Sequence, residues 1–166
     1  MRNRIFKLTA LAITISLAMV LSYIESQIPA LVSIPGIKAG LANIAVIFTL
    51  YKFGVKEATA VSTIRVVLIS LLFGSPVSLI YSISGAILSL VSMIILKKLT
   101  HLTEITVSVV GGVAHNIGQI AVASFMLSTN VVIYYLPFLL VSGTIAGIVI
   151  GIASAILVKR VRTDYK

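Results

Sequence analysis

The stretch VVIYYLPFLLVSGTIAGIVIGIASAILVKR, residues 131–160, decides the fold class of this chain. Its first 28 residues, 131–158, contain no charged side chain, and it ends in Lys159 and Arg160. About 20 consecutive apolar residues are enough for a helix to cross the hydrocarbon core of a bilayer. The stretch therefore predicts a membrane-spanning helix that stops at a basic, water-facing end.

Five more mainly apolar segments precede this one, and together they predict an all-α integral membrane bundle of six transmembrane helices. The other predicted helices cover residues 8–23, 39–53, 56–73, 77–96 and 104–127. Short connections favour antiparallel neighbours. Residues 25–37 carry two prolines and a glycine, so they are predicted as a structured loop. Residues 1–166 are expected to form a single transmembrane domain, with 8–24 kept as the first helix and not cleaved as a signal peptide.

The composition excludes several classes of function. The chain is 59% hydrophobic and only 10% charged, whereas about a quarter of the residues in a soluble domain are charged. No length remains for a soluble catalytic domain. The net charge of +9 lies in short clusters between apolar segments and not along a stripe, so nucleic acid is not an expected partner. The absence of cysteine excludes thiolate metal sites and cysteine nucleophiles.

The basic residues also predict an orientation. All of the 13 lysines and arginines except Lys38 and Arg65 flank the predicted helices on one side. Cytoplasmic loops carry an excess of lysine and arginine. Both termini are therefore predicted to be cytoplasmic, in a multi-pass protein of the cell membrane.

Small residues repeat at four-residue spacing along three of the predicted helices. Gly143, Gly147 and Gly151 form one such stripe, and Ala10, Thr14, Ala18 and Ser22 form another. The fifth helix carries the small residues Gly111, Gly112, Ala114 and Gly118. Small residues let membrane helices approach closely. Such stripes hold a bundle together, and on the first helix the stripe also fits a docking face for another membrane subunit.

Polar residues at membrane depth are the candidate ligand site, because a charged side chain there costs at least ~2.5–3.5 kcal/mol. Arg65 lies near the middle of the third helix, and three polar residues lie near the middle of the fifth. In the predicted topology these side chains converge in the outer half of the membrane, beneath the loop 25–38. The predicted substrate-binding residues are Lys38, Asn43, Arg65, Tyr81, His115, Asn116, Gln119 and Tyr135.

Arginine offers a planar fork of donors suited to carboxylate or phosphate. With Lys38 nearby, the cavity is expected to be net positive and to take an anionic small molecule with an apolar body. Structural alternatives stay open. Arg65 could instead pair with Glu57, two turns earlier, and His115 could be a satisfied interior histidine. Asn43 could only bridge helices, and one of Tyr134 and Tyr135 could belong to an interfacial aromatic belt.

Catalysis is not expected. The chain has one aspartate, Asp164, and three scattered glutamates. Magnesium-dependent transferases need clustered carboxylates, and a Ser-His-Asp set needs an acid beside the histidine. There is no Walker A loop, so no nucleotide is hydrolysed by this chain. The prediction is a protein that is not an enzyme and binds no metal or cofactor.

Three segments carry a family resemblance: PGIKAGLANI at 35–44, Arg65, and AHNIGQ at 114–119. With the six-helix layout, they resemble the Gx transporter family, also labelled heptaprenyl diphosphate synthase component I. That family is similar to the substrate-binding S components of energy-coupling-factor (ECF) transporters, which are ABC importers for vitamins.

The resemblance implies that the chain captures a small molecule from outside, under the loop after the first helix. It also implies a transmembrane coupling subunit and two cytoplasmic ATPases, which hydrolyse the ATP. Ala10, Thr14 and Ala18 match the positions at which S components contact the coupling subunit, although Thr14 replaces the usual alanine. Flavin-, quinone- and isoprenoid-related cofactor precursors are the expected substrates. The alternative is a non-catalytic membrane subunit that assists heptaprenyl diphosphate synthase.

Overall fold

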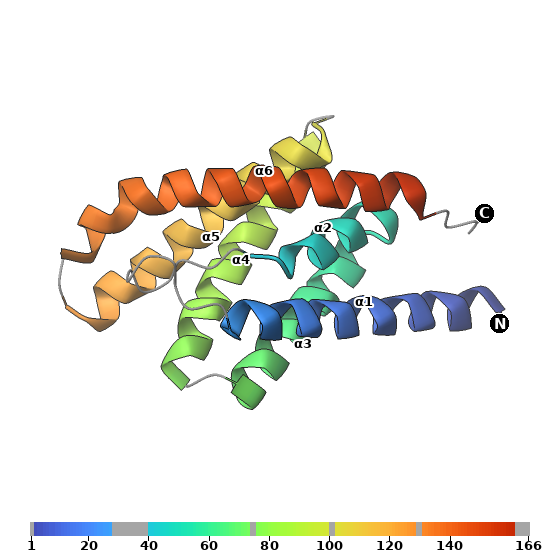
Figure 1. Ribbon diagram of the computed structural model, residues 1–166, viewed down its shortest axis with the longest axis horizontal. Coiled ribbons are helices and arrows are strands. Elements are labelled where there is room, and N and C mark those ends of the chain that lie inside the picture. The colour runs from blue at the N-terminus through green and yellow to red at the C-terminus, as the bar shows by residue number, and fades with distance from the viewer. Residues whose placement is uncertain (1, 28–39, 74–75, 100–101, 129–130, 162–166) are drawn as a thin grey trace.

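The computed structural model describes residues 2–27, 40–73, 76–99, 102–128 and 131–161, and these residues form helices and short connections. Six α-helices and one 3-10 helix follow one another along the chain (Figure 1). The all-α prediction is therefore confirmed. The elements are α1 (Arg2–Gln27), α2 (Asn43–Lys52), α3 (Val55–Phe73), α4 (Pro76–Leu99), α5 (Glu104–Met126), η1 (Val131–Tyr135) and α6 (Leu136–Arg160).

Four of these helices, α1, α4, α5 and α6, are long and apolar enough to cross a membrane. Their surfaces carry large, solvent-accessible apolar side chains, such as Leu8 on α1, which is 67% exposed, and Phe125 on α5, which is 86% exposed. Exposed apolar area on this scale marks a surface that faces lipid. The chain is accordingly a membrane protein.

The other two helices differ from the predicted spans. α2 has 10 residues and rises only about 15 Å, half the thickness of the hydrocarbon core. α3 has 19 residues, and three of them are charged: Lys56, Glu57 and Arg65. Six crossings and cytoplasmic termini therefore stay predictions, whereas six helices are observed.

Backbone chemistry explains why three helix boundaries moved. α2 begins at Asn43 and not at 39, because Gly40 has a left-handed φ of +71°, which a helix cannot contain. Gly54, with φ of +113°, ends α2 and lets α3 begin at once. α6 begins at Leu136, after η1, because Pro137 lacks an N–H and fits only the first turn of a helix.

Helices α4, α5 and α6 form one half of the bundle, and their backbones touch through glycines. A Cβ added to Gly112 would lie 2.6 Å from the carbonyl oxygen of Gly143. One added to Gly147 would lie 2.6 Å from Cα of Val109, and one added to Gly118 would lie 2.8 Å from the carbonyl oxygen of Ser84. No larger residue fits there, so these glycines hold α5 against both of its neighbours.

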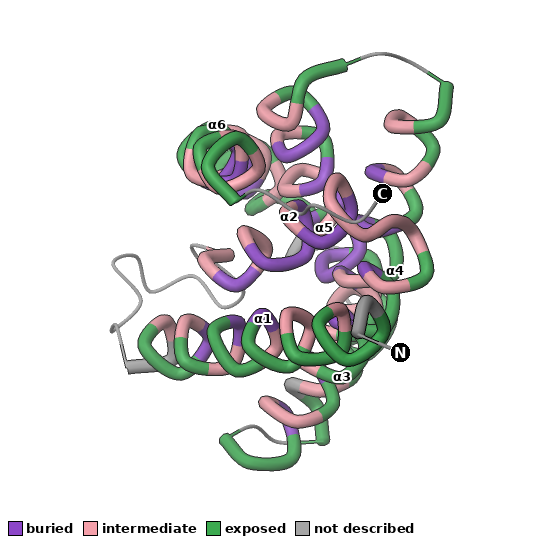
Figure 2. Tube along the Cα trace, turned by 90° about the vertical axis from the view of Figure 1, so that its right-hand side faces the viewer, coloured by how far each residue is buried: buried purple, intermediate pink, exposed green. Residues whose placement is uncertain are grey.

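Helices α1, α2 and α3 form the other half, which is joined by side chains. The short α2 supplies much of the core through Val46, Ile47 and Leu50, which are almost fully buried. Lys7 on α1 forms an ion pair and hydrogen bond with Glu57 on α3. α1 is buried along one narrow stripe, and the rest of its surface is exposed (Figure 2).

That stripe contains the residues predicted to dock another subunit. Ala18 is 0% exposed and packs with Ala42 and Ala45, and Thr14 is 7% exposed. Thr14 donates a hydrogen bond to the carbonyl oxygen of Ala10 at 2.7 Å. The stripe therefore packs α1 within its own chain, and a partner reaches Ala18 only if α1 moves away from α2.

Candidate functional site

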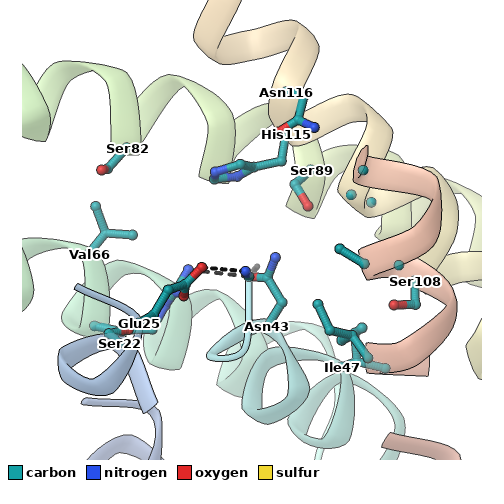
Figure 3. A pocket seen from close by; sticks show the side chains of 18 of the residues that line it. Ser22, Glu25, Asn43, Ile47, Val66, Ser82, Ser89, Ser108, His115 and Asn116 are labelled. Atoms are coloured by element: carbon teal, nitrogen blue, oxygen red, sulfur yellow. Dashed lines mark hydrogen bonds between the residues drawn. The ribbon is translucent and has the colours of Figure 1, made fainter. Parts of the chain in front are cut away.

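A cavity of about 140 Å³ lies between the two halves of the bundle. Both halves line it, with α1–α3 on one wall and α4–α6 on the other (Figure 3). It reaches the helix ends that lie far from the basic clusters, at Glu25, Gly40 and Phe73. The polar side chains that line it are Ser22, Glu25, Asn43, Arg65, Ser70, Ser82, Ser89, Ser108, His115 and Asn116.

Arg65 is the charged centre of this cavity. Its Nη2 donates a hydrogen bond to Oδ1 of Asn43 at 3.3 Å, which joins α3 to the start of α2. Its Nε is buried and has no hydrogen-bond partner among the described residues. An arginine N–H with no acceptor in a low-dielectric site is costly, so this atom is available to an acceptor from a ligand.

The alternative pairing of Arg65 with Glu57 is wrong. Glu57 contacts Lys7 instead. The two turns between Glu57 and Arg65 separate the carboxylate from the guanidinium, and α1 brings a closer cation to Glu57. Arg65 is therefore left to the cavity.

Glu25 is an acid of this site that the list of candidate residues did not include. α1 continues to Gln27, so Glu25 is helical and does not begin a loop. Its carboxylate accepts a hydrogen bond from the backbone N–H of Gly40 and also acts electrostatically on Arg65. Lys38 lies outside the described residues. The charges of Arg65 and Glu25 balance, so the described lining does not have the expected net positive charge.

Helix α5 brings His115 to the wall opposite Glu25 and Asn43 (Figure 3). His115 packs on Gly85 of α4, where an added Cβ would lie 2.8 Å from the ring Cε1. Gln119 packs on the same glycine and is only 7% exposed, but it does not line the cavity. Asn116 lines the cavity and also donates from Nδ2 to the carbonyl oxygen of Leu139 at 2.6 Å, so it bridges α5 and α6.

Besides Gln119, two more predicted residues do not line the cavity. Tyr81 is half-buried on α4 and does not line the cavity. Tyr135 is 43% exposed at the end of η1, and Tyr134 is 84% exposed. The 3-10 turn before Pro137 displaces both tyrosines from the line that a continuous helix from 131 would have given them. Their exposure is typical of an interfacial aromatic position.

Two serines at the inner part of the cavity were also missed. Ser89 on α4 and Ser108 on α5 are each 3% exposed, and their Oγ atoms have no hydrogen-bond partner in the described part of the chain. Sequence offers little signal for them, because serine is common on the small-residue faces of membrane helices.

A second hollow, apolar and about 270 Å³ in volume, lies between α1, α2 and α6 near the basic ends of α1 and α6. Ala10 and Thr14 line it, together with larger apolar side chains. The latter are Phe6, Ile13, Leu17, Ile44, Phe48, Phe53, Leu157 and Val161. We refer to it as the α1–α6 groove.

The comparisons with known proteins agree with the family predicted from the sequence. The chain matches the family described as heptaprenyl diphosphate synthase component I over residues 14–157. The chain belongs to this family. No curated protein and no solved structure matches it. The matched range contains the whole of α2, α3, α4 and α5 and all of the residues that line the cavity, Ser22 and Glu25 on α1 included.

Proposed function

We propose that this chain is the S component of an energy-coupling-factor importer, and that it captures a small amphipathic molecule with one anionic group. The observation that carries the proposal is Arg65, which lines a cavity between membrane helices and whose buried Nε has no hydrogen-bond partner among the described residues. A carboxylate or phosphate is the acceptor that an arginine fork binds best. The apolar wall beside it, with Ile47, Val66 and Ile150, suits an apolar body.

The position of the cavity supports capture from outside. The basic residues at the ends of α4 and α6 belong on the cytoplasmic side by the positive-inside rule. Glu25 and Gly40 line the cavity at the opposite end of the bundle. In this orientation the cavity opens toward the outer face of the cell membrane.

The coupling subunit is proposed to dock in the α1–α6 groove. The groove is apolar and lies at the basic, cytoplasmic end, where a membrane partner with cytoplasmic ATPases would meet the chain. Ala10 and Thr14 line the groove, and half-buried Ala10 is more accessible to a partner than Thr14, which is 7% exposed. Ala18 is the third proposed docking residue, and it becomes available only when α1 shifts from Ala42 and Ala45.

The chain itself is proposed to bind without catalysis, while the partner ATPases hydrolyse ATP. Glu25 is the only carboxylate among the described residues of the cavity lining, and the acids and histidines of the described ranges form no cluster that could hold a metal ion. Magnesium-dependent prenyl transfer needs such a cluster.

The test of the site is native mass spectrometry of the purified protein, comparing wild type with Arg65→Ala and His115→Ala. We expect a co-purified small molecule in the wild type, and about tenfold or greater loss of it in Arg65→Ala, because a hydrogen bond to a charged group contributes about 1.5–3 kcal/mol. The matched control is Thr59→Ala, which changes an exposed residue on the same helix as Arg65. Equal occupancy in all variants would remove Arg65 and His115 from the site.

The test of the partner is affinity purification of the tagged chain from its native membrane. We expect a coupling subunit and two ATPases in the eluate, and their loss when Ala10 and Thr14 are changed to Leu. The family description names a synthase, and the alternative function predicts a soluble prenyl-diphosphate synthase in the eluate instead. That result, with no bound small molecule, would overturn the importer proposal.

A further inference from the structure

Ser89 and Ser108 line the cavity, and their buried Oγ atoms have no hydrogen-bond partner in the described residues. Serine in a helix commonly donates to the carbonyl one turn earlier. Ser92, one turn along the same helix from Ser89, does so: its Oγ donates to the carbonyl oxygen of Leu88 at 2.7 Å. The hydroxyls of Ser89 and Ser108 do not make this bond. They therefore differ from a serine whose hydroxyl is satisfied by its own helix.

An unpaired hydroxyl is expensive in this setting. A hydroxyl that leaves water loses its hydrogen bonds to water, and the hydrocarbon region supplies no replacement. Each of the two serines is only 3% exposed. A polar atom that is buried, unpaired and directed into a cavity is satisfied by what the cavity holds. Two such atoms in one part of the cavity favour a hydrogen-bonding contact with a bound ligand.

The two serines lie apart from the charged pair. They are on the side of the cavity away from Glu25 (Figure 3), and the apolar side chain of Ile47 lies on the same side as Ser108. Ser108 is seven residues from His115 along α5, which corresponds to about 10 Å of helix. Gly111 on α5 lies against both Met93 and Ser89 of α4. A Cβ added to Gly111 would lie 2.7 Å from the sulfur of Met93 and 3.2 Å from Ser89 Oγ.

We infer that Ser89 and Ser108 form a second, uncharged subsite at the inner end of the cavity, which binds a neutral hydrogen-bonding group of the captured molecule. A hydroxyl both donates and accepts, so a carbonyl, an amide or a hydroxyl fits, whereas an ionised group has no counter-charge among the described residues around these serines. The captured molecule then has an anionic group at Arg65, an apolar middle and a neutral polar end. This inference rests on the proposed function and specifies the substrate class of that site.

The decisive variant is Ser89→Ala combined with Ser108→Ala in the full chain, studied in detergent. Native mass spectrometry should show about tenfold lower occupancy by the molecule that co-purifies with the wild type, since two neutral hydrogen bonds are lost. The ligand-free variant should unfold at a higher temperature than the ligand-free wild type, because two unsatisfied hydroxyls have been removed. A gain in stability together with a loss of binding is a signature that a purely structural serine does not produce.

Two controls make the result specific. Ser92→Ala removes an exposed hydroxyl from the same helix, and it should leave occupancy unchanged. Ser154→Ala removes a fully buried hydroxyl that donates to the carbonyl oxygen of Ile44, so its unfolding temperature should fall or stay level. If the alanine pair folds poorly, Ser89→Cys combined with Ser108→Cys replaces it as the test. The cysteine pair nearly keeps the side-chain size but weakens the hydrogen bonds, so it should also lose occupancy.

The outcomes separate the two proposals. If the wild type carries a small molecule and the alanine pair carries equally much, the subsite is wrong and the proposed function stands. A co-purified mass that matches only a phospholipid or the detergent, or none at all, overturns both. A molecule with an anionic group and no neutral polar end also refutes the subsite.

Discussion

The two halves of the bundle are held together by different means. In α4–α6, glycines bring backbone against backbone, as where Gly112 meets Gly143 and Gly118 meets Ser84. In α1–α3, helices meet through side chains, through the Lys7–Glu57 pair, and through the bond from Arg65 to Asn43. Backbone contacts leave no freedom to adjust, whereas side chains can change rotamer. The cavity therefore lies between a rigid wall and an adjustable one.

This contrast also explains how the polar groups of the site are arranged. The rigid half presents His115, Ser89 and Ser108 from helices that cannot shift easily. The adjustable half presents Arg65, Asn43 and Glu25, and these three connect α3, α2 and α1 to one another around the cavity. We therefore expect that, when a molecule binds between the walls, α1–α3 move more than α4–α6.

The largest expected effect comes from breaking the rigid half with Gly118→Leu. The new Cβ would lie 2.8 Å from the carbonyl oxygen of Ser84, and a backbone atom cannot move aside. We expect destabilisation of about 3 kcal/mol or more, or loss of folded protein. The measurement is denaturant unfolding in detergent. Ala121→Leu, on the exposed face of the same helix, should be nearly neutral, and equal effects of the two changes would refute the contrast.

A smaller loss is expected from Asn116→Ala, which removes the polar bridge in the rigid half. The Nδ2 donor to Leu139 is lost from a site that is 7% exposed, so unfolding should become easier by about 1–2 kcal/mol. Ser142→Ala is the control, because its hydroxyl donates to the same carbonyl oxygen at 3.1 Å from a half-buried position. If both variants have the same free energy of unfolding, the buried Asn116 amide stabilises the protein no more than the Ser142 hydroxyl does.

The corresponding change in the adjustable half is Asn43→Ala, and we expect it to affect stability less than Asn116→Ala does. Its hydrogen bond to Arg65 is long, at 3.3 Å, so its loss should cost about 0.5–1 kcal/mol. Occupancy by the co-purified molecule should nevertheless fall, since Arg65 is no longer oriented. Unfolding and native mass spectrometry on the same preparations separate the two effects; a large stability loss with full occupancy would contradict this assignment.

The smallest effect is expected for the ion pair between Lys7 and Glu57. Its side chains are 41% and 21% exposed, so after screening by solvent the pair should contribute about 0.5 kcal/mol. A double-mutant cycle with Lys7→Ala and Glu57→Ala measures this coupling, which should shrink in high salt. A coupling above ~2 kcal/mol would mean that α1 is fastened to α3 more rigidly than the contrast allows.

The cavity shows how far the sequence predicted the site. Four predicted residues line it, Asn43, Arg65, His115 and Asn116, and all are polar groups within apolar helices, which composition alone makes conspicuous. Glu25 is not among the predicted site residues, because its place beside Arg65 depends on α1 continuing past the predicted boundary. Gln119, Tyr81 and Tyr135 do not line it. Tyr135 is displaced because a periodic pattern does not reveal the 3-10 turn of η1.

The sequence by itself determined that the chain is a helical membrane protein, because helix-length apolar runs can satisfy their backbone hydrogen bonds in lipid only as helices. It also predicted the family, through the motifs at 35–44, 65 and 114–119, and the family match over residues 14–157 confirms this prediction. Only the tertiary structure decided the partners of the charges. Glu57 pairs with Lys7, and Arg65 lines the cavity with Glu25 beside it. Ion pairing depends on which helices lie side by side, and spacing along one helix does not contain that information.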